Sequence, residues 1–384
     1  MSPSPRVRAG ARIGILSTFP PTACGIATFS AALAAGLIAN GASVDVVRCG
    51  PAPMFEDPLV MATFGTGAAG ELERAVDALD ATDAAVVQHE FGIYEGEDGA
   101  AVLDVLEALA VPTILVAHTV VRSPTQHQRE LFGAICDAAD HVLVMTDASR
   151  ERLLAGYDVD PSRVAVVPHG AVTPAADPDR LGVAAGGHGG QLLTWGLLGP
   201  GKGIEWAIDA VATLSDLAPP PRYLIAGATH PKVAASSGET YRRMLSDRAV
   251  STGAAPMVTF DGAYRDLASL TELISAADLV VLPYDSEEQV TSGVLVDAIA
   301  AGRPVVATAF PHATELLASG AGLIVPQRDP AALAAAIRAV LTDDALAAGM
   351  AAEARRLAPT LSWTSVAAQY LSLADELIGE RRVA

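Results

Sequence analysis

The stretch that decides the fold is "LPYDSEEQVTSGVLVDAIAAGRPVVATAFPHATELL", Leu282–Leu317. It contains the end of one apolar run, an acidic loop, a segment with helical spacing, a second apolar run and a further loop. Runs of about four to eight Val, Ile and Leu residues with little alternation are typical of parallel strands buried on both faces. Gly302 and Pro304 end the helical segment before the next strand begins. The stretch therefore predicts a strand–helix–strand unit of a parallel sheet.

The same alternation of strand and helix continues along the whole chain. In the first half the apolar runs are "RIGILST", "SVDVVRC", "AAVVQHE", "TILVAHT", "HVLVMT" and "RVAVVPHG". In the second half they are "QLLTWGLL", "RYLIAGA", "MVTFDGA", "LVVLPY", "PVVATAF" and "GLIVP". Segments with helical spacing, such as "IATFSAALAAGLIAN", lie between these runs. The pattern predicts an α/β protein with two doubly wound, Rossmann-like domains.

The domain boundary is expected in "TPAADPDRLGVAAGGHGG", Thr173–Gly190, which is rich in Ala, Gly, Pro and Asp and has no apolar period. We therefore predict a first domain over 1–175 and a second over 176–361. A final amphipathic helix is expected over 362–384, with Ser362 as its N-cap. Ligands of open α/β sheets bind at the carboxyl ends of the strands, so a central cleft between the two sheets is the expected site.

Composition excludes several classes of function. The 384 residues are 51% hydrophobic and 18% charged, as in a globular protein with a substantial core. The net charge of −19 argues against nucleic acid and anionic membrane as partners, because both require a basic surface. The cysteines Cys24, Cys49 and Cys136 form no zinc-binding or disulfide pattern, and no apolar run approaches the ~20 residues that span a bilayer. We expect a soluble, cytoplasmic protein.

In the first domain, three groups of candidate site residues follow predicted strands. Gly25 lies at the turn into a helix whose N-terminal N–H groups could contact an anion or a sugar hydroxyl. His89 and Glu90, in "QHEFGIYEGEDG", are candidates for orienting an acceptor, with a capped loop as the alternative. His118 ends the strand "TILVAHT" and is either a core histidine or a hydrogen-bond partner of a donor sugar or its leaving phosphate.

In the second domain, "GLLGPGKGIEWAIDAVA", Gly196–Ala212, matches the phosphate-loop pattern G-x-x-x-x-G-K up to Lys202. A nucleotide-hydrolysing loop needs a following Ser or Thr to hold magnesium, and Gly203 cannot supply that hydroxyl. An NTPase remains an alternative, since Asp285 in "LVVLPYD" could imitate its second acidic motif. The favoured interpretation is a diphosphate bound without metal, with Lys202 as the cation.

A second anion site is expected at the start of "GVLVDAIAAG". The backbone N–H groups around Thr291 to Val294, which include those of Ser292 and Gly293, would attract a phosphate together with the helix dipole. Asp297 lies on the first turns of the same helix, where its carboxylate could accept both ribose hydroxyls of a nucleotide. Because the surrounding residues are apolar, a lone Asp there requires a partner.

At these residues the chain resembles the retaining glycosyltransferases of family 4, which have the two-Rossmann GT-B fold. The resemblance covers nearly the whole length and is strongest from about Gly196 to Pro326. It rests on "AIAAGRPVVAT", which is similar to the family's A-x-A-x-G-x-P-V-V-A-T segment, and on Lys202 in its G-R-L…K-G motif. The last helix, with Trp363, is similar to the family's C-terminal helix, which crosses back onto the first domain.

The resemblance implies specific roles and contains three departures. His118 and Lys202 would be the catalytic residues, and His89 and Glu90 would bind the acceptor. The implied donor-binding residues are Gly25, Gly196, Lys202, Gly227, Glu288, Gln289, Ser292, Gly293, Val294 and Asp297. Leu197 stands where the family has its diphosphate arginine, and Asp297 replaces the second glutamate of the family's E-x7-E motif. The first glutamate has no direct match, since Gln289 has its spacing while Glu287 and Glu288 lie just before.

The function that the resemblance implies is a metal-independent, retaining transfer of a hexose from a GDP- or UDP-linked donor to a hydroxyl of a sugar or small-molecule acceptor. No cofactor and no metal are expected, and homodimerisation is left open. A sugar-nucleotide epimerase on the same scaffold and a non-catalytic nucleotide- or sugar-binding protein are the alternatives. An epimerase would convert the donor without acceptor, and a binding protein would neither transfer nor hydrolyse the sugar.

Overall fold

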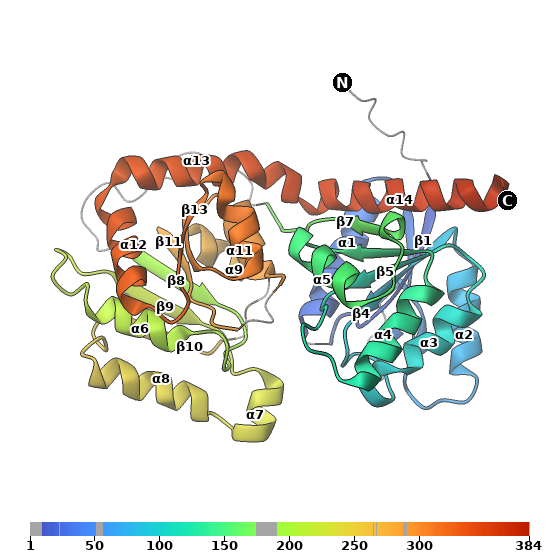
Figure 1. Ribbon diagram of the computed structural model, residues 1–384, viewed down its shortest axis with the longest axis horizontal. Helices are drawn as coiled ribbons and strands as arrows, with labels where there is room; N and C mark the ends of the chain where they lie inside the picture. Colours follow the sequence, from blue (N-terminus) through green and yellow to red (C-terminus); the bar gives the residue numbers. More distant parts are fainter. Residues whose placement is uncertain are drawn as a thin grey trace. The chain divides into compact units, whose positions relative to one another are not determined.

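The computed structural model describes residues 10–22, 24–50, 57–173, 190–263, 265, 267–286 and 290–383. The chain divides into two compact units (Figure 1). Unit 1 comprises Met1–Gly170 and Trp363–Ala384, and unit 2 comprises Ala171–Ser362. Each is built on a single sheet in which all neighbouring strands are parallel, with helices on both faces. The predicted fold class of two Rossmann-like domains is confirmed.

Unit 1 has a seven-stranded sheet of order β3-β2-β1-β4-β5-β6-β7. Its strands are β1 (Arg12–Ser17), β2 (Ser43–Cys49), β3 (Val60–Phe64), β4 (Ala84–His89), β5 (Thr113–Ala117), β6 (His141–Val144) and β7 (Val164–Val166). Alternate residues of each central strand face opposite cores: Ile13 and Ile15 pack on one side, and Leu16 packs on the other. The helices are α1 (Gly25–Ala39), α2 (Glu71–Asp80), α3 (Ala101–Ala108), α4 (Gln126–Ala138), α5 (Asp147–Gly156) and α14 (Trp363–Val383), with short 3₁₀ turns at Glu97–Gly99 and Pro161–Arg163.

Every apolar run quoted above forms a strand, but the sequence analysis missed edge strand β3. Its residues are mostly half-buried, and Met61 is exposed. A strand that pairs on one edge and buries only part of its surface does not need a continuous apolar run. The segment "VMATF" therefore lacks the signal that marks the buried strands.

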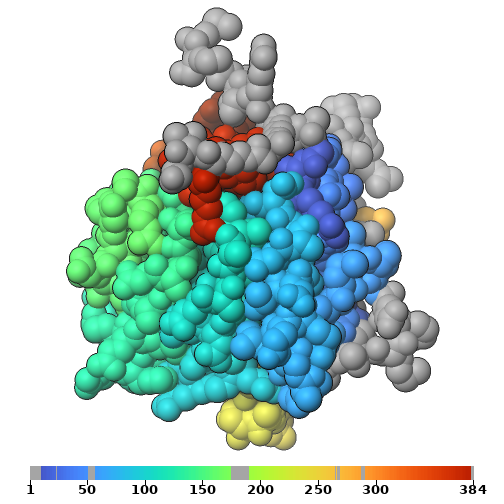
Figure 2. Space-filling model, turned by 90° about the vertical axis from the view of Figure 1, so that its right-hand side faces the viewer, coloured from blue at the N-terminus to red at the C-terminus, as the bar shows by residue number. Residues whose placement is uncertain are grey.

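The C-terminal helix α14 is part of unit 1, where it packs beside α1 in the same hydrophobic core. It begins directly after Ser362, the residue that the sequence analysis assigned as its N-cap. At its other end Arg381 forms an ion pair with Asp140 at 2.9 Å, and Figure 2 shows the red end of the helix seated among green and blue residues of unit 1. The boundary predicted at 175/176 lies in residues 174–189, outside the described residues.

Unit 2 has a six-stranded sheet of order β10-β9-β8-β11-β12-β13. The strands are β8 (Gln191–Trp195), β9 (Arg222–Ala226), β10 (Val258–Asp261), β11 (Leu279–Leu282), β12 (Val305–Thr308) and β13 (Gly322–Val325). One core lies under α6 (Ile204–Ala212), α8 (Thr240–Ser251) and α12 (Pro330–Thr342), and the other under α9 (Leu267–Ser275), α10 (Gly293–Ala300), α11 (Pro311–Leu316) and α13 (Asp344–Leu361). The short helix α7 (Pro231–Ser237) and the 3₁₀ turn Leu317–Ser319 complete the unit.

None of the helices within the described residues is long and apolar enough to cross a membrane.

Candidate functional site

The candidate phosphate-binding residues of unit 2 lie at the carboxyl ends of two strands that are neighbours in the sheet. The loop from β8 to α6 carries Lys202, and the loop from β11 to α10 carries Tyr284 and Ser292. Because β8 and β11 are parallel and adjacent, their following loops emerge at the same edge of the sheet. The two loops also bond directly, since the N–H of Asp285 donates to Gly201 O at 3.2 Å. The sheet topology thus brings together the two segments that the sequence analysis singled out for phosphate.

Gly203 is required by close packing of these loops. Its φ is +60°, and a Cβ at this position would lie 1.9 Å from the carbonyl oxygen of Pro283. Ser or Thr could not occupy the position unless one of the loops moved. The hydroxyl of a magnesium-dependent phosphate loop is therefore excluded by the backbone of the β11–α10 loop. This contact explains the residue that the sequence analysis noted as a departure from the phosphate-loop pattern.

Lys202 is half-buried, and its charge is held against an aromatic ring. Its Nζ lies over the ring of Tyr284, 4.4 Å from the ring centroid. Within the part of the chain that the structure describes, no carboxylate forms an ion pair with Lys202. A half-buried ammonium group without a counter-ion attracts an anion.

The N-terminus of α10 provides N–H groups next to this loop. Ser292 caps the helix, because its Oγ accepts from the N–H of Leu295 at 3.2 Å. The N–H groups of Gly293 and Val294 have no intrahelical partner, as in the first turn of any helix. A Cβ placed on Gly196 would lie 3.6 Å from Val294 Cγ2, so the β8–α6 loop borders this first turn.

His312 was missed by the sequence analysis and holds the start of α10 in place. It is buried, and its Nδ1 accepts from the backbone N–H of Ser292 at 2.9 Å. The histidine belongs to α11, which follows β12, the neighbour of β11. Its signal in the sequence was its place after a buried strand, in "AFPHATELL", the same signal that identified His118.

Asp297 lies on α10 and carries an isolated, half-buried carboxyl group. Burial raises its pKa from 3.8 to about 7. Within the described residues its side chain forms no hydrogen bond or ion pair. The requirement for a partner that the sequence analysis noted is thus met by no described protein group, and its role toward ribose stays a prediction.

Gly227 follows β9 and is required by a close crossing of backbones. Its φ is +143°, and a Cβ here would lie 2.0 Å from the carbonyl oxygen of Gly196. Its N–H donates to Asp261 O at 2.7 Å, and its carbonyl accepts from the Arg242 guanidinium. Since both backbone groups are paired within the protein, the crossing accounts for the glycine, and a donor contact at Gly227 stays a prediction.

Several predicted donor residues cannot be placed. Glu287, Glu288 and Gln289, which correspond to the region of the family's first glutamate, lie outside the described residues. Leu197 lies in the β8–α6 loop and is half-buried, so no positive charge stands at the position of the family's arginine.

In unit 1, Gly25 is the first residue of α1, as predicted, but the turn does not require a glycine. A Cβ at this position would meet no atom within 4 Å, and its backbone is not in the left-handed region. The local backbone thus gives no reason for a glycine here, and the absent side chain leaves the helix N-terminus open. Cys24 caps this helix, with its Sγ accepting from the N–H of Ala27 at 3.3 Å, a role the sequence analysis missed.

His118 lies just past β5 and is held by hydrogen bonding and aromatic packing. Its Nε2 lies 2.6 Å from Gln88 Oε1, so this nitrogen carries the proton and Nδ1 is the remaining acceptor. Phe29 packs edge-on against it with a centroid distance of 4.8 Å. Burial is the main cause that lowers its pKa from 6.5 to about 3, and coulombic interactions with His169 and His89 add to this effect. His118 is therefore neutral at physiological pH.

His89 is fully buried, between the rings of Phe91 and Phe132 at centroid distances of 5.0 and 4.9 Å. Neither ring nitrogen has a hydrogen-bond partner among the described residues, and burial lowers its pKa to about 4. Direct contact with an acceptor, which the sequence analysis predicted, does not fit this burial. Glu90 is half-buried and accepts from Thr119 Oγ1 and, at 3.2 Å, from the N–H of Phe91, so its acceptor role stays a prediction.

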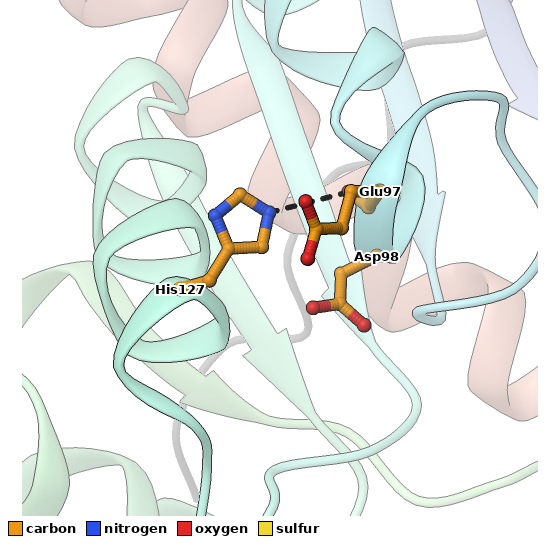
Figure 3. Close-up of side chains that lie close together, drawn as sticks. All are labelled: Glu97, Asp98 and His127. Carbon is orange, nitrogen blue, oxygen red and sulfur yellow. Dashed lines mark hydrogen bonds between the residues drawn. The ribbon is translucent and has the colours of Figure 1, made fainter.

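Near these residues, the side chains of Glu97, Asp98 and His127 come together on the surface of unit 1 (Figure 3). Their potential ligand atoms lie within 4.8 Å of one another. The group already makes protein contacts, since His127 Nε2 lies 3.5 Å from Glu97 O and Asp98 accepts from Gln128 at 3.1 Å. The group belongs to unit 1, whereas Lys202 belongs to unit 2.

Comparison with known proteins agrees with this arrangement. The family described as "Glycosyl transferases group 1" matches residues 189–343, and "Glycosyltransferase Family 4" matches residues 23–173. A D-inositol 3-phosphate glycosyltransferase of Corynebacterium glutamicum (strain R) is 30% identical over 295 residues, covering 71% of this chain and 68% of that protein. A protein of the same name from Geodermatophilus obscurus is 32% identical over 294 residues, covering 70% of this chain and 63% of its own.

Solved structures share the fold across almost the whole chain. Anabaena Alr3699/HepE, in complex with UDP, superposes with a TM-score of 0.73 at 18% identity, covering 95% of this chain and 100% of that one. Sucrose-phosphate synthase from Thermosynechococcus elongatus gives a TM-score of 0.70 at 21% identity, covering 96% and 100% of the two chains. At these identities the likeness establishes the fold alone. With the family matches and the relatives, it shows that the chain belongs to the family 4, or group 1, glycosyltransferases.

Proposed function

We propose that this enzyme transfers a hexosyl group from a nucleoside-diphosphate sugar to a hydroxyl of a sugar or polyol, with retention of configuration and without a metal ion. The observation that carries the proposal is the half-buried Lys202, which has no carboxylate partner among the described residues and borders the same sheet edge as the N-terminus of α10. Its ammonium and the N–H groups of Gly293 and Val294 form a fixed set of positive groups for a diphosphate.

These groups would act on the leaving group. As the bond from the anomeric carbon to the donor phosphate breaks, negative charge develops on the diphosphate. Donors that are already oriented toward that charge stabilise the transition state more than the ground state. Lys202 and the N-terminus of α10 would provide this stabilisation without a divalent ion. Gly203 excludes the hydroxyl group that would help to hold such an ion.

Retention would follow from front-face attack. The acceptor hydroxyl approaches the anomeric carbon from the face that the phosphate leaves, a new C–O bond forms, and the hydroxyl proton passes to a departing phosphate oxygen. Neutral His118 suits a hydrogen-bonding role toward the donor sugar, because a pKa of about 3 makes its imidazole too weak a base to take up a proton near pH 7. A charged imidazolium is not needed in this scheme.

The comparisons support particular substrates as the first to test. Alr3699/HepE was solved with UDP and with UDP-glucose, and the relatives are named for D-inositol 3-phosphate. A UDP-linked hexose is therefore the first donor, with GDP-linked hexoses as the alternative, and inositol 3-phosphate is the first acceptor.

The test combines binding with turnover. Thermal shifts with UDP, GDP and ADP, all in excess EDTA, should identify the base by the largest stabilisation. The matching sugar nucleotide is then followed by NMR with and without acceptor. Acceptor-dependent formation of an α-linked product from an α-linked donor supports the proposal. Donor conversion without acceptor would indicate an epimerase, and binding without any turnover would indicate a binding protein.

A further inference from the structure

We propose that Tyr284 is a positioning residue, whose aromatic face fixes the Lys202 ammonium for the diphosphate of the donor. The inference rests on the proposed function, because it assigns a task within the same phosphate site. Tyr284 was not among the predicted site residues, and its relation to Lys202 depends on the packing of two loops that are distant in sequence.

The ring of Tyr284 is itself held firmly. Tyr284 lies two residues past the end of β11, is 1% exposed and packs against Phe310 with a centroid distance of 5.0 Å. Its carbonyl oxygen accepts from Thr308 Oγ1. The tyrosine is therefore held at its backbone and along its ring, and the half-buried side chain of Lys202 lies over the ring face.

The aromatic face, and not the hydroxyl, carries the proposed role. The Tyr284 hydroxyl is buried and has no hydrogen-bond partner among the described residues. A phenylalanine would keep the face that attracts a cation and would remove an unsatisfied polar group. An aliphatic residue would fill much of the space but would leave Lys202 free to sample other rotamers.

Positioning matters here because Lys202 has neither a described ion-pair partner to orient it nor a second charged residue at position 197 of its loop. Its side chain makes no ion pair with a described carboxylate, and Leu197 on the same loop contributes no charge. A lysine side chain is long and loses considerable rotamer freedom when it binds a phosphate. A ring that orders it in advance lowers that cost without neutralising the charge.

The chain offers a direct probe of this contact, since its two lysines are Lys202 and Lys232. Reductive ¹³C-methylation keeps both amines cationic and labels them together with the N-terminus. The Lys202 methyl signal, assigned by its loss in Lys202→Arg, should lie upfield in the full-length protein because the ring current of Tyr284 acts on it. It should stay upfield in Tyr284→Phe and return to the position of exposed Lys232 in Tyr284→Leu. A Lys202 signal without an upfield shift in the unmodified sequence would overturn the inference, whether or not Tyr284→Leu folds.

Binding separates positioning from simple core packing. By calorimetry in EDTA, Tyr284→Leu should weaken UDP about tenfold and leave uridine within about twofold, while Tyr284→Phe binds both as the parent does. Equal weakening of UDP and uridine would show a merely structural role and overturn the inference. If the parent protein binds UDP but Tyr284→Leu binds it equally well, only this inference fails. If the parent protein binds no nucleoside diphosphate, the proposed function fails instead, and the methyl signal still reports on the contact.

Discussion

Unit 1 and unit 2 each place polar side chains at the carboxyl end of a parallel sheet, but they treat charge in opposite ways. In unit 1, His89, His118 and His169 are kept neutral, because burial lowers their pKa values to about 4, 3 and 4. In unit 2, the Lys202 ammonium lies over the ring of Tyr284, and burial raises the pKa of Asp297 to about 7. The difference fits the roles proposed above, in which unit 2 would supply positive charge for a phosphate and unit 1 would supply neutral groups for hydrogen bonds with a sugar.

The largest effect on turnover is expected from removing the ammonium group of Lys202 in unit 2. Lys202→Ala should lower kcat by about 100- to 1,000-fold, the range seen when one fixed donor to a developing negative charge is removed. The melting temperature should stay within about 2 °C, because Lys202 is only half-buried. The matched control is Lys232→Ala, which removes the exposed second lysine and should leave kcat unchanged. Equal turnover by the Lys202 variant at saturating donor would remove Lys202 from the catalytic site.

The next effect concerns the packing that excludes a hydroxyl beside Lys202. Gly203→Ser should destabilise the protein by about 3 kcal/mol, because its Cβ would collide with Pro283 O and its φ is positive. The measurement is urea unfolding followed by fluorescence, with Gly25→Ser as the control, since a Cβ at Gly25 meets no atom within 4 Å. A folded Gly203→Ser variant with magnesium-dependent release of phosphate from ATP would revive the NTPase alternative.

The pH dependence should have opposite signs in the two units. A histidine with a folded pKa below its unfolded value of 6.5 stabilises the fold fully above pH 6.5, and this contribution is lost as the pH falls toward about 4. Asp297, with a folded pKa of about 7 against 3.8 unfolded, contributes fully below pH 3.8 and loses that contribution as the pH rises through 7.

Hydrogen exchange measured at several pH values can report the pH dependence of stability separately for each unit. Between pH 7 and pH 5, protection factors should fall for peptides of β4 and β5 and rise slightly for α10. His169→Asn should reduce the pH dependence of the protection factors in β4 and β5. Asp297→Asn should reduce the pH dependence of the protection factors in α10. Equal slopes of the same sign in both units would contradict the charge assignments.

The smallest effect is expected from the partner of His118. Gln88→Leu removes the amide that accepts from Nε2 at 2.6 Å and should lower kcat/KM for the sugar nucleotide by about tenfold. Binding of UDP alone, which lacks the sugar, should change little, and Gln88→Glu should restore part of the activity because it keeps an acceptor oxygen. A Gln88→Leu enzyme with unchanged kcat/KM would show that the hydrogen bond does not position His118.

Much of this architecture could be predicted from the sequence because buried strands leave a strong local signal. The runs around Ile13, Leu193 and Val281 are apolar on both faces, whereas half-exposed β3 carries no such run. Polar residues in the segments that follow buried strands, such as His118 after β5 and Lys202 in the loop after β8, could be identified in the same way. Local sequence pattern thus predicts which segments reach the carboxyl edge of a sheet.

The contacts that these residues make could not be predicted, because they join segments that are distant in the chain. Nothing near Lys202 in the sequence points to Tyr284, and nothing near Ser292 points to His312. His89 was predicted to face an acceptor, yet its ring lies between Phe91 and Phe132, since a strand end can turn its side chain into the core. The reason for Gly203 likewise lies in the loop that carries Pro283.

The most direct test of a metal-free diphosphate site in unit 2 is a calorimetric titration of UDP in excess EDTA, with the unmodified protein and with Lys202→Ala. We predict saturable binding to the unmodified protein without divalent metal, and binding at least about tenfold weaker to the variant. Binding that appears only after magnesium is added, or equal affinity of the two proteins, would contradict it.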